Sequence, residues 1–412
     1  MRGIHTATDY TMGIDAVALG TDTTASGEDS FAQGSGSRAT AFSAVAVGEG
    51  AYANREAAFA EGLNTTAQGI AAHAEGSGTR ATQNYAHAEG QNTTASAVAA
   101  HAEGQSTSAA GAGSHAEGNG SEASNVYSHA EGLSTHSDGT ASHAEGITTT
   151  ASGAATHSEG TNTTAGGDSA HAQGSNTQAI GNFSDAGGYY TIAQNSYQTV
   201  IGKYNTASNP ANNGLQVDDA FIIGNGTGAA ARANAFRVTF EGEVYAATSV
   251  FTSGADYAEM FEWLDGNPAG EDRRGYFVTL EGEYIRTATD QDEYVLGVIS
   301  ASPSVIGDAQ GCNWQGMYLR DAWGAVIYEW ADQQQRPMVN PQYNPNLRYL
   351  PRTQRPEWAN VGMMGKLLIL DDGSCQPNEY CRPNAQGIGT ASARGYRVLK
   401  RFGANQVLIC LK

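Results

Sequence analysis

Two groups of residues in this sequence carry side chains that could do acid–base or metal chemistry. The first is a series of eight histidines spaced 14 residues apart, each followed two positions later by Glu or, in the last case, by Gln. Its members are His73/Glu75, His87/Glu89, His101/Glu103, His115/Glu117, His129/Glu131, His143/Glu145, His157/Glu159 and His171/Gln173. The second is an acidic cluster, Ser253, Asp256, Glu259 and Glu262, within ten residues. Both need elements that place their members together.

The histidine series, here called the His/Glu ladder, has two interpretations. On strands, residues i and i+2 share a face, so successive His/Glu pairs would stack about 4.8 Å apart. Such a column could bind metal ions or anions, because His is a common ligand. Alternatively, each imidazole could pair with a carboxylate of a neighbouring chain. We favour the pairs and predict no metal and no cofactor, because earlier coils carry Val45 and Phe59 at the His position. Stability should then change between about pH 5 and 7, where His titrates.

A strict 14-residue repeat supplies the elements for the ladder. Gly recurs without a slip at 20, 34, 48, 62, 76, 90, 104, 118, 132, 146, 160, 174, 188 and 202. Ala stands two residues before each Gly except at Ser158 and Val200, and a second Ala series begins at Ala25. Each repeat therefore predicts two short strands of about five residues joined by tight turns.

The two strands should form one flattened coil with a thin interior. Positions such as Ala44 share a face with the first Ala series, and positions such as Thr65 share one with the second, so both inner faces carry small residues. This interior is too poor in apolar area to hold one chain folded. The outer face of the first strand carries large groups such as Phe31 and Val47, whereas the second strand's outer face is polar. The pattern predicts association of more than one chain through the first face, which should be buried as a result.

The repeats DAVALG, SAVAVGEGAYA and SHAEGxxTxASG resemble the head of YadA-like trimeric adhesins. The resemblance covers residues 14–209 and implies a left-handed β-roll in a homotrimer. The variant with SHAEG and TTASG is similar to fibre proteins of bacteriophages and prophages of Gram-positive bacteria. Residues 1–13 would be a lead-in, and the chain is expected to be a short fibre or a fragment of a longer one.

A neck over residues 210–252 should follow, with short strands at Phe221–Ile223 and Phe236–Phe240. The Gly-rich GNGTG between them lacks the Lys and the helix of a phosphate-binding loop. Beyond residue 253 the composition predicts a compact, mostly β domain. Its strands are expected at Gly275–Leu280, Tyr294–Ile299, Ala325–Tyr328, Lys366–Leu370, Tyr396–Leu399 and Gln406–Leu411, with the proline-rich stretch Gln333–Trp358 as a long loop. The fold class is thus all-β.

The segment SGADYAEMFEWLDGNPAGEDRRGYFVTLEGEYIR, with LGVIS after it, resembles the IMC autoproteolytic cleavage domain. The resemblance covers residues 253–412. It implies an intramolecular chaperone that trimerises, aligns three chains and then cuts itself free. A slowly closing, non-local assembly benefits from such a nucleus.

The acidic cluster fits that chemistry, because cutting a peptide bond needs a group to activate water and a donor for the leaving amide. Crowded carboxylates split their pKa values into one acid and one base. The resemblance implies a cut at the Ala255–Asp256 bond with Glu259 as acid/base. The rival assignment is Ser253 as an acyl-shift nucleophile at the Ser253–Gly254 bond; some family members carry Ser where this chain has Ala255, which argues against a nucleophile directly before Asp256. The remaining alternative is that Asp256 and Glu259 are solvated charges at a domain entrance.

Composition excludes several function classes. The formal net charge of −20 argues against binding nucleic acid or an anionic membrane. No apolar h-region begins the chain and no run of 18 apolar residues occurs, so we expect neither a signal peptide nor membrane insertion. The four cysteines, Cys312, Cys375, Cys381 and Cys410, match no zinc or redox spacing and are expected to be buried free thiols.

Three functions remain. The favoured one is a phage or prophage tail fibre or spike, assembled in the bacterial cytoplasm, that contacts other tail or baseplate proteins and a host-surface receptor, for which a glycan is one candidate. Any catalysis would be a single self-cleavage. The second is a bacterial surface adhesin with a non-catalytic trimerisation domain. The third, a polysaccharide-degrading spike, lacks a paired-carboxylate groove in the pattern.

Overall fold

The computed structural model describes residues 12–207, 219–310, 316–331 and 334–412. The chain divides into two compact units, Met1–Ser249 and Val250–Lys412, which are considered separately. Within the described residues there is no α-helix, and the one helical turn is the 3-10 turn η1 (Arg352–Gln354). The described part also contains no helix long and apolar enough to cross a membrane. The all-β prediction is confirmed.

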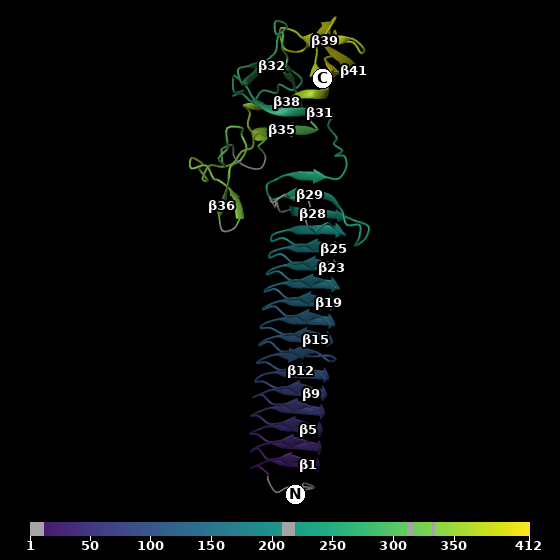
Figure 1. Ribbon diagram of the computed structural model, residues 1–412, viewed down its shortest axis with the longest axis vertical. Helices are drawn as coiled ribbons and strands as arrows, with labels where there is room; N and C mark the ends of the chain where they lie inside the picture. The colour runs from purple at the N-terminus through teal and green to yellow at the C-terminus, as the bar shows by residue number, and fades with distance from the viewer. Residues whose placement is uncertain (1–11, 208–218, 311–315, 332–333) are drawn as a thin grey trace. The chain divides into compact units, whose positions relative to one another are not determined.

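The first unit is a β-solenoid in which each 14-residue repeat forms one coil (Figure 1). Equivalent residues of successive coils pair in parallel, so that Val17 lies beside Phe31 and Gly20 beside Gly34. The first strands of the coils are β1 (Val17–Thr21), β3 (Phe31–Ser35), β5 (Val45–Glu49), β7 (Phe59–Leu63), β9 (His73–Ser77), β11 (His87–Gln91), β13 (His101–Ala102), β15 (His115–Asn119), β17 (His129–Leu133), β19 (His143–Ile147), β21 (His157–Thr161), β23 (His171–Ser175), β25 (Asp185–Tyr189) and β27 (Thr199–Lys203).

The second strands form the opposite sheet and are shorter than the five residues expected. They are β2 (Thr24–Ala25), β4 (Arg38–Ala39), β6 (Tyr52–Ala53), β8 (Thr66–Ala67), β10 (Arg80–Ala81), β12 (Thr94–Ala95), β14 (Ser108–Ala109), β16 (Glu122–Ala123), β18 (His136–Ser137), β20 (Thr150–Ala151), β22 (Thr164–Ala165), β24 (Gln178–Ala179) and β26 (Ile192–Ala193). A tight corner follows each one. Between β4 and β5, for example, the Ala44 N–H donates to the Ala41 carbonyl, and Ser43 has φ +51°. This turn uses residues that would otherwise extend the strand.

The interior of the roll is made of small side chains, as the alternation predicted. Both Ala series and the accompanying Ser and Thr positions are buried; Ala46, Ala53 and Thr65, for example, are 0% exposed. The Gly column is required by packing. At Gly90, φ is +98° and an added Cβ would lie 2.2 Å from the carbonyl oxygen of Gly104 in the next coil. Only Gly permits coils to stack this closely.

The end of the roll is continued by three strands. β28 (Asp219–Asn225) pairs in parallel with β27, and β29 (Asn234–Thr239) and β30 (Val244–Ala246) follow as an antiparallel meander. The two neck strands expected from the sequence are therefore present, and they extend the first sheet of the roll.

The second unit is built around an antiparallel sheet in the order β33-β32-β34-β38-β42-β41-β39-β40; β31 also pairs with β38, and β35 pairs in parallel with β31. The strands are β31 (Asp256–Glu262), β32 (Phe277–Glu281), β33 (Tyr284–Thr287), β34 (Gly297–Ile299), β35 (Val305–Gly307), β36 (Tyr328–Ala331), β37 (Gln334–Pro337), β38 (Trp358–Leu370), β39 (Tyr380–Pro383), β40 (Gly389–Ser392), β41 (Tyr396–Gly403) and β42 (Gln406–Leu411). Phe277, Leu367, Ile369 and Ile409 lie in its core.

Most expected strands of this unit are present, with three differences. Lys366–Leu370 is only the second half of the 13-residue β38, because the segment from Trp358 pairs with β31. The strand expected at Tyr294–Ile299 begins only at Gly297, and the one expected at Ala325–Tyr328 begins at Tyr328. The proline-rich stretch is mostly loop but also contains β37 and η1.

The cysteine prediction holds in part. Cys375 and Cys381 are buried free thiols, whereas Cys410 is half-buried and Cys312 lies outside the described residues.

Candidate cleavage site and the His/Glu face

The acidic cluster lies on and before strand β31, which is held on both edges. Along one edge β31 pairs with β38, from Asp256 opposite Gly365 to Glu262 opposite Trp358. Along the other edge Tyr257 pairs with Val305 of β35. Both neighbours fix β31 as an extended strand, so its side chains alternate between two faces.

This alternation separates the two acids that the sequence suggested as a pair. Asp256, Ala258 and Met260 point to the buried face, and Tyr257 and Glu259 to the other. Residues three apart on a strand lie on opposite faces, so Asp256 and Glu259 do not meet within one chain.

Asp256 lies in a buried environment. The residue is 6% exposed and its Oδ2 has no hydrogen-bond partner among the described residues. Burial raises the pKa of the Asp256 carboxyl group, and hydrogen bonds from the Ser300 hydroxyl and from its own backbone N–H oppose this rise. The sequence predicted that a neighbouring carboxylate would perturb this pKa. Desolvation is instead the main cause of the rise. The contact with its own N–H also places the carboxyl group beside the nitrogen of the Ala255–Asp256 bond.

The carbonyl group of the same peptide bond has a defined donor. The backbone N–H of Lys366 donates to the Ala255 carbonyl oxygen at 3.1 Å. The residue before Lys366 must be Gly. Gly365 has φ +119°, and a Cβ there would lie 2.3 Å from the Ala255 carbonyl oxygen. A second glycine, Gly362, gives room for the acid, because a Cβ there would lie 2.7 Å from Asp256 Oδ2.

The other members of the cluster lie apart from this bond. Glu259 accepts a hydrogen bond of 2.6 Å from the Tyr257 hydroxyl. Glu262 ends β31 at the opposite end from Asp256, and Ser253 is exposed before the strand begins. Of the four side chains in the cluster, only that of Asp256 therefore lies at the Ala255–Asp256 bond.

Sequence reasoning missed Ser300, Gly362, Gly365 and Lys366. All four are distant from Asp256 in the chain and reach it only through strand pairing. A cavity of ≈ 240 Å³ lies next to Ser300, with Asn360 and Trp358 also in its lining. Two buried atoms of that lining, Asn360 Oδ1 and Trp358 Nε1, have no hydrogen-bond partner among the described residues. The space is large enough for several water molecules.

The His/Glu ladder is a stack of parallel imidazoles along the first sheet of the roll. Neighbouring rings lie 4.7–5.1 Å apart, and the stack begins on Phe59, 4.9 Å from His73. The Nε2 atom of each of the eight histidines is buried and has no hydrogen-bond partner in the described part of the chain. Its distance to the nearest Glu oxygen is, for example, 3.9 Å in His73–Glu75 and 3.4 Å in His157–Glu145. Within one chain these pairs are incomplete.

Within one chain, the nearest glutamate of a histidine in the middle of the ladder comes from the preceding coil. Glu131 was grouped with His129, but its Oε1 atom lies 3.6 Å from Nε2 of His143 on the next coil. Residues i and i+2 are about 6.8 Å apart along a strand, so a glutamate that leans across the shorter spacing between coils meets the next imidazole instead. The Glu131 side chain is also 32% exposed. The face expected to be buried is therefore only half-buried in one chain.

Burial has a clear effect on the middle of the stack. It lowers the pKa values of His101, His115 and His129, and the positive charge of the next histidine lowers them further. The neutral imidazole is therefore favoured there.

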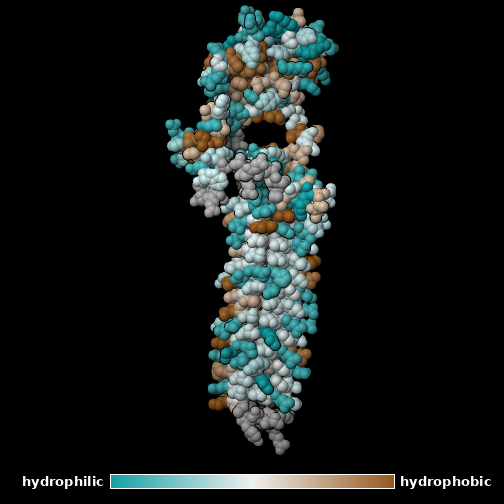
Figure 2. Space-filling view, in the orientation of Figure 1, coloured by the Kyte–Doolittle hydropathy of each residue, from teal (hydrophilic) through white to brown (hydrophobic). Residues whose placement is uncertain are grey.

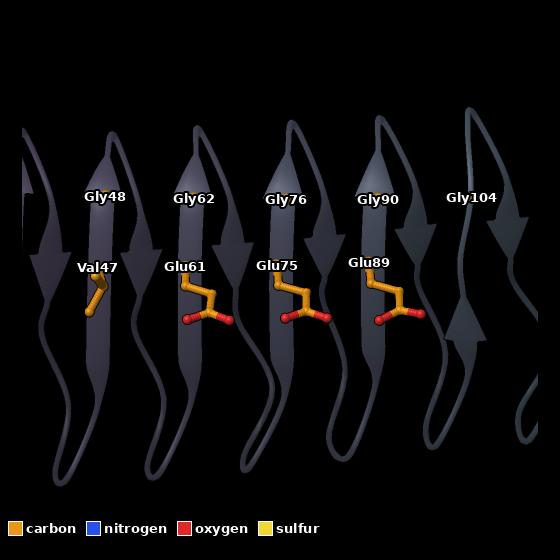
Figure 3. A pocket seen from close by; sticks show the side chains of 9 residues that line it. All are labelled: Val47, Gly48, Glu61, Gly62, Glu75, Gly76, Glu89, Gly90 and Gly104. Atoms are coloured by element: carbon orange, nitrogen blue, oxygen red, sulfur yellow. The ribbon is translucent and has the colours of Figure 1, made fainter.

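The glutamates line a groove beside the Gly column. Figure 3 shows Glu61, Glu75 and Glu89 side by side on consecutive coils, next to Gly62, Gly76 and Gly90. The groove has a volume of ≈ 730 Å³. A similar one of ≈ 480 Å³ is lined by Glu117, Glu131, Glu145 and Glu159. Each coil repeats the same acid along the groove, and a hydrogen bond with the Glu75 side chain raises the pKa of Glu61.

The same face contains sets of potential metal ligands. In groups such as Glu75–His87–Glu89, one His nitrogen and two carboxylate oxygens lie within 4.8 Å of one another. Filling every coil would place divalent ions at the spacing of the rings, where their repulsion is strong. We retain the prediction of polar pairs without metal.

The fold and these two regions define a class: a β-solenoid fibre protein with a C-terminal β domain. Comparison with known proteins is consistent with it. The family model described as Peptidase_G2, IMC autoproteolytic cleavage domain, matches residues 209–403, which include β28–β30. The pre-neck appendage protein of Bacillus phage B103 is 35% identical over 167 residues, 38% of this chain and 19% of that protein. The pre-neck appendage protein of Bacillus phage phi29 is 37% identical over 123 residues, 29% of this chain and 14% of that protein.

Among solved structures, the C-terminal fragment of bacteriophage phi29 gene product 12 is 29% identical, with a TM-score of 0.34, and covers 38% of this chain and 100% of that fragment. The matched regions span between 14% and 20% of the length of the curated relatives. Residues 209–403 thus match the family model of the IMC autoproteolytic cleavage domain, and the chain is similar to phage pre-neck appendage proteins, in agreement with the resemblance found in the sequence.

Proposed function

We propose that this chain is a structural protein of a phage or prophage appendage, that it works as a homotrimer, and that its C-terminal domain cuts the Ala255–Asp256 bond once the chains are aligned. The observation that carries the cleavage is the geometry of this bond. Its nitrogen lies beside the buried Asp256 carboxyl group and its carbonyl oxygen accepts the Lys366 N–H.

The reaction is hydrolysis. Water attacks the Ala255 carbonyl carbon and gives up one proton to a base. Negative charge develops on the carbonyl oxygen, which the Lys366 N–H stabilises. The carbon–nitrogen bond then breaks, and the Asp256 carboxyl group gives its proton to the leaving nitrogen. The products are a new C-terminus at Ala255 and a new N-terminus at Asp256. The raised pKa of Asp256 increases the fraction of the acid that holds this proton.

Association of chains is supported by the first face of the roll. Val17 and Leu19 remain 42% and 38% exposed in one chain, and the ladder nitrogens lack partners. Packing copies of the chain against this face would cover the apolar groups and let each imidazole reach a carboxylate. The relatives are named as phage appendage proteins, so we also propose a place in the virion, contacts with other virion proteins and an unidentified host-surface receptor.

Intact-mass spectrometry of freshly expressed protein tests the cleavage. Wild type should yield two fragments that meet between Ala255 and Asp256, and Asp256→Asn should stay full length, because the amide cannot supply the proton. Lys400→Ala, which changes a surface charge elsewhere in the domain, is the matched control and should cut like wild type. Full-length wild type after prolonged incubation of the assembled protein would refute the proposal. Light scattering of the same samples measures the number of chains.

A further inference from the structure

Two buried thiols meet in the loop that joins β38 to β39. Cys375 and Cys381 are free cysteines, each is 0% exposed, and both belong to one core cluster of the second unit. Hydrogen bonding between the two thiol groups lowers the pKa of Cys375 and raises the pKa of Cys381. The Cys381 thiol is therefore the donor and the Cys375 sulfur the acceptor, so the two sulfur atoms face each other.

Strand β40 fixes this arrangement from one side. The Ala391 N–H donates to Ser374 Oγ at 2.8 Å, and Ala391 lies directly opposite Cys381 in the β39–β40 pair. Residues directly opposite each other in an antiparallel pair have Cα atoms about 4.5–5.5 Å apart. Ser374 is thus anchored beside the strand partner of Cys381, and Cys375 is the next residue in the chain.

Strand β41 holds the same two cysteines from the other side. Tyr396 pairs with Cys381, and Arg401 Nε donates to the Cys375 carbonyl oxygen at 3.2 Å. The Cys375 N–H donates to Asp371 Oδ2 at 3.3 Å, and Asp371 is itself ion-paired with Arg401. Because both ends of the loop are already fixed, a disulfide bond between them would need little movement of the backbone.

The loop nevertheless lies at the surface. Ser374 and every residue from 376 to 380 are exposed, so the two cysteines are the buried residues of this segment. Local opening of the segment would admit a small reagent to the thiols without unfolding of the sheet. Cys375 is the thiol that would attack, because its lowered pKa gives it the larger thiolate fraction.

We propose that Cys375 and Cys381 form a redox-active dithiol, which a small-molecule disulfide such as oxidised glutathione converts to a disulfide bond within the folded domain. The Cys375 thiolate attacks one glutathione sulfur, breaks the S–S bond of the reagent and releases one glutathione thiolate. Cys381 then loses its proton and attacks the Cys375 sulfur, which releases the second glutathione. The protein loses two electrons and two protons, and the oxidant gains them. The proposal does not depend on cleavage of the chain.

The disulfide would make the stability of the second unit depend on the redox state of its surroundings. It closes a short loop, residues 375–381, and the chain-entropy model then predicts a rise in the thermal midpoint of about 5–10 °C for a unit of this size. The two thiols would stay reduced in a cytoplasm and could pair outside it.

Peptide mapping of the full-length protein after incubation with oxidised glutathione at about pH 8 tests the site. The protein is unfolded in N-ethylmaleimide and digested with trypsin, which leaves both cysteines in one peptide because it does not cut between Arg382 and Pro383. This peptide should lose two hydrogens and take up no N-ethylmaleimide, and dithiothreitol should reverse the change. Cys410→Ser is the matched control and should oxidise and gain stability like wild type, whereas Cys375→Ser should do neither.

Each outcome decides the proposal. The linked peptide together with a higher thermal midpoint in calorimetry supports it. Two alkylated cysteines after prolonged incubation, a glutathione left on either cysteine, or a link that appears only in urea would overturn it, because the thiols would then not meet in the folded domain. A link that lowers the midpoint also overturns it, since the fold would hold the disulfide only under strain. Oxidised and reduced wild type give the same comparison if Cys375→Ser fails to fold.

Discussion

The Gly column of the roll gives a sharp test of how the coils hold together. In Gly90→Ala the new Cβ would lie 2.2 Å from the Gly104 carbonyl oxygen, with φ at +98°. That oxygen accepts the Gln91 N–H at 2.8 Å, so relieving the clash breaks or lengthens a bond between coils. Gly36→Ala is the matched control, because Gly36 also has positive φ, +67°, but nothing lies within 4 Å of the added Cβ.

The magnitudes distinguish the two variants. A left-handed conformation costs a non-Gly residue about 1–2 kcal/mol, and this cost applies to both. Gly90→Ala adds about 1 kcal/mol for the lost hydrogen bond and about 1–3 kcal/mol for the groups left without partners. We therefore expect a loss of about 1–2 kcal/mol for Gly36→Ala and about 3–6 kcal/mol for Gly90→Ala.

Guanidinium unfolding followed by circular dichroism measures this difference at equal protein concentration. Hydrogen exchange should localise the loss of protection in Gly90→Ala to the coils of β11 and β13. Equal destabilisation of the two variants would refute the reasoning, because it would mean that backbone conformation alone, and not the stacking distance, requires Gly in this column.

Three further predictions concern charge and metal. Burial lowers the pKa values of His101, His115 and His129, and we expect this effect to outweigh the carboxylates that other copies would bring to the imidazoles; stability should then be full above about pH 6.5 and fall as the pH drops below it, by up to about 1.4 kcal/mol per pH unit for each histidine. Thermal midpoints that stay constant or rise from pH 7.5 to 5 would contradict this. Asp371→Ala should destabilise the second unit by about 3–5 kcal/mol, because Asp371 is 1% exposed and its loss removes the one carboxylate of the ion pair with Arg401, which keeps only hydrogen bonds to backbone carbonyl oxygens; urea unfolding measures it, with Asp272→Ala at an exposed ion pair as the near-neutral control. Protein purified without chelator and dialysed against zinc should retain less than one ion per chain by elemental analysis, and a stoichiometric content would instead establish the ladder as a metal site.

The roll could be predicted almost completely from the sequence because its contacts repeat. A residue that packs on its equivalent 14 positions later shows this in the spacing alone, as the Gly column and the Ala series do. Figure 2 shows apolar residues along the edges of the roll. Leu63, Leu133 and Ile147, which follow the Gly of their coils, are 43–48% exposed. The corners were harder to predict, because the turn after each second strand depends on left-handed residues such as Ser43 that have no single residue type.

The cleavage site was predictable only in part, for the opposite reason. Asp256 could be selected from its motif, but Lys366, Gly365 and Ser300 reach it through the pairing of β31 with β38 and the packing of β34, which no local pattern records. The separation of Asp256 from Glu259 follows from the secondary structure of DYAEMFE. A three-residue spacing places two side chains on one face of a helix but on opposite faces of a strand.

The repeat itself has a consequence for the order of assembly. A chaperone that cut itself free from a single chain would leave the roll before its register was set, and a 14-residue repeat offers many equivalent registers that differ by whole coils. Cleavage that follows alignment of the chains, as proposed, would keep the C-terminal domain in place until the register is set. The buried imidazoles apply a related constraint to the roll, because a shift of four coils would place Val45 and Val47 opposite His101 and leave its Nε2 without a carboxylate. Register in the roll and cleavage in the C-terminal domain would then depend on the same event, the alignment of the chains.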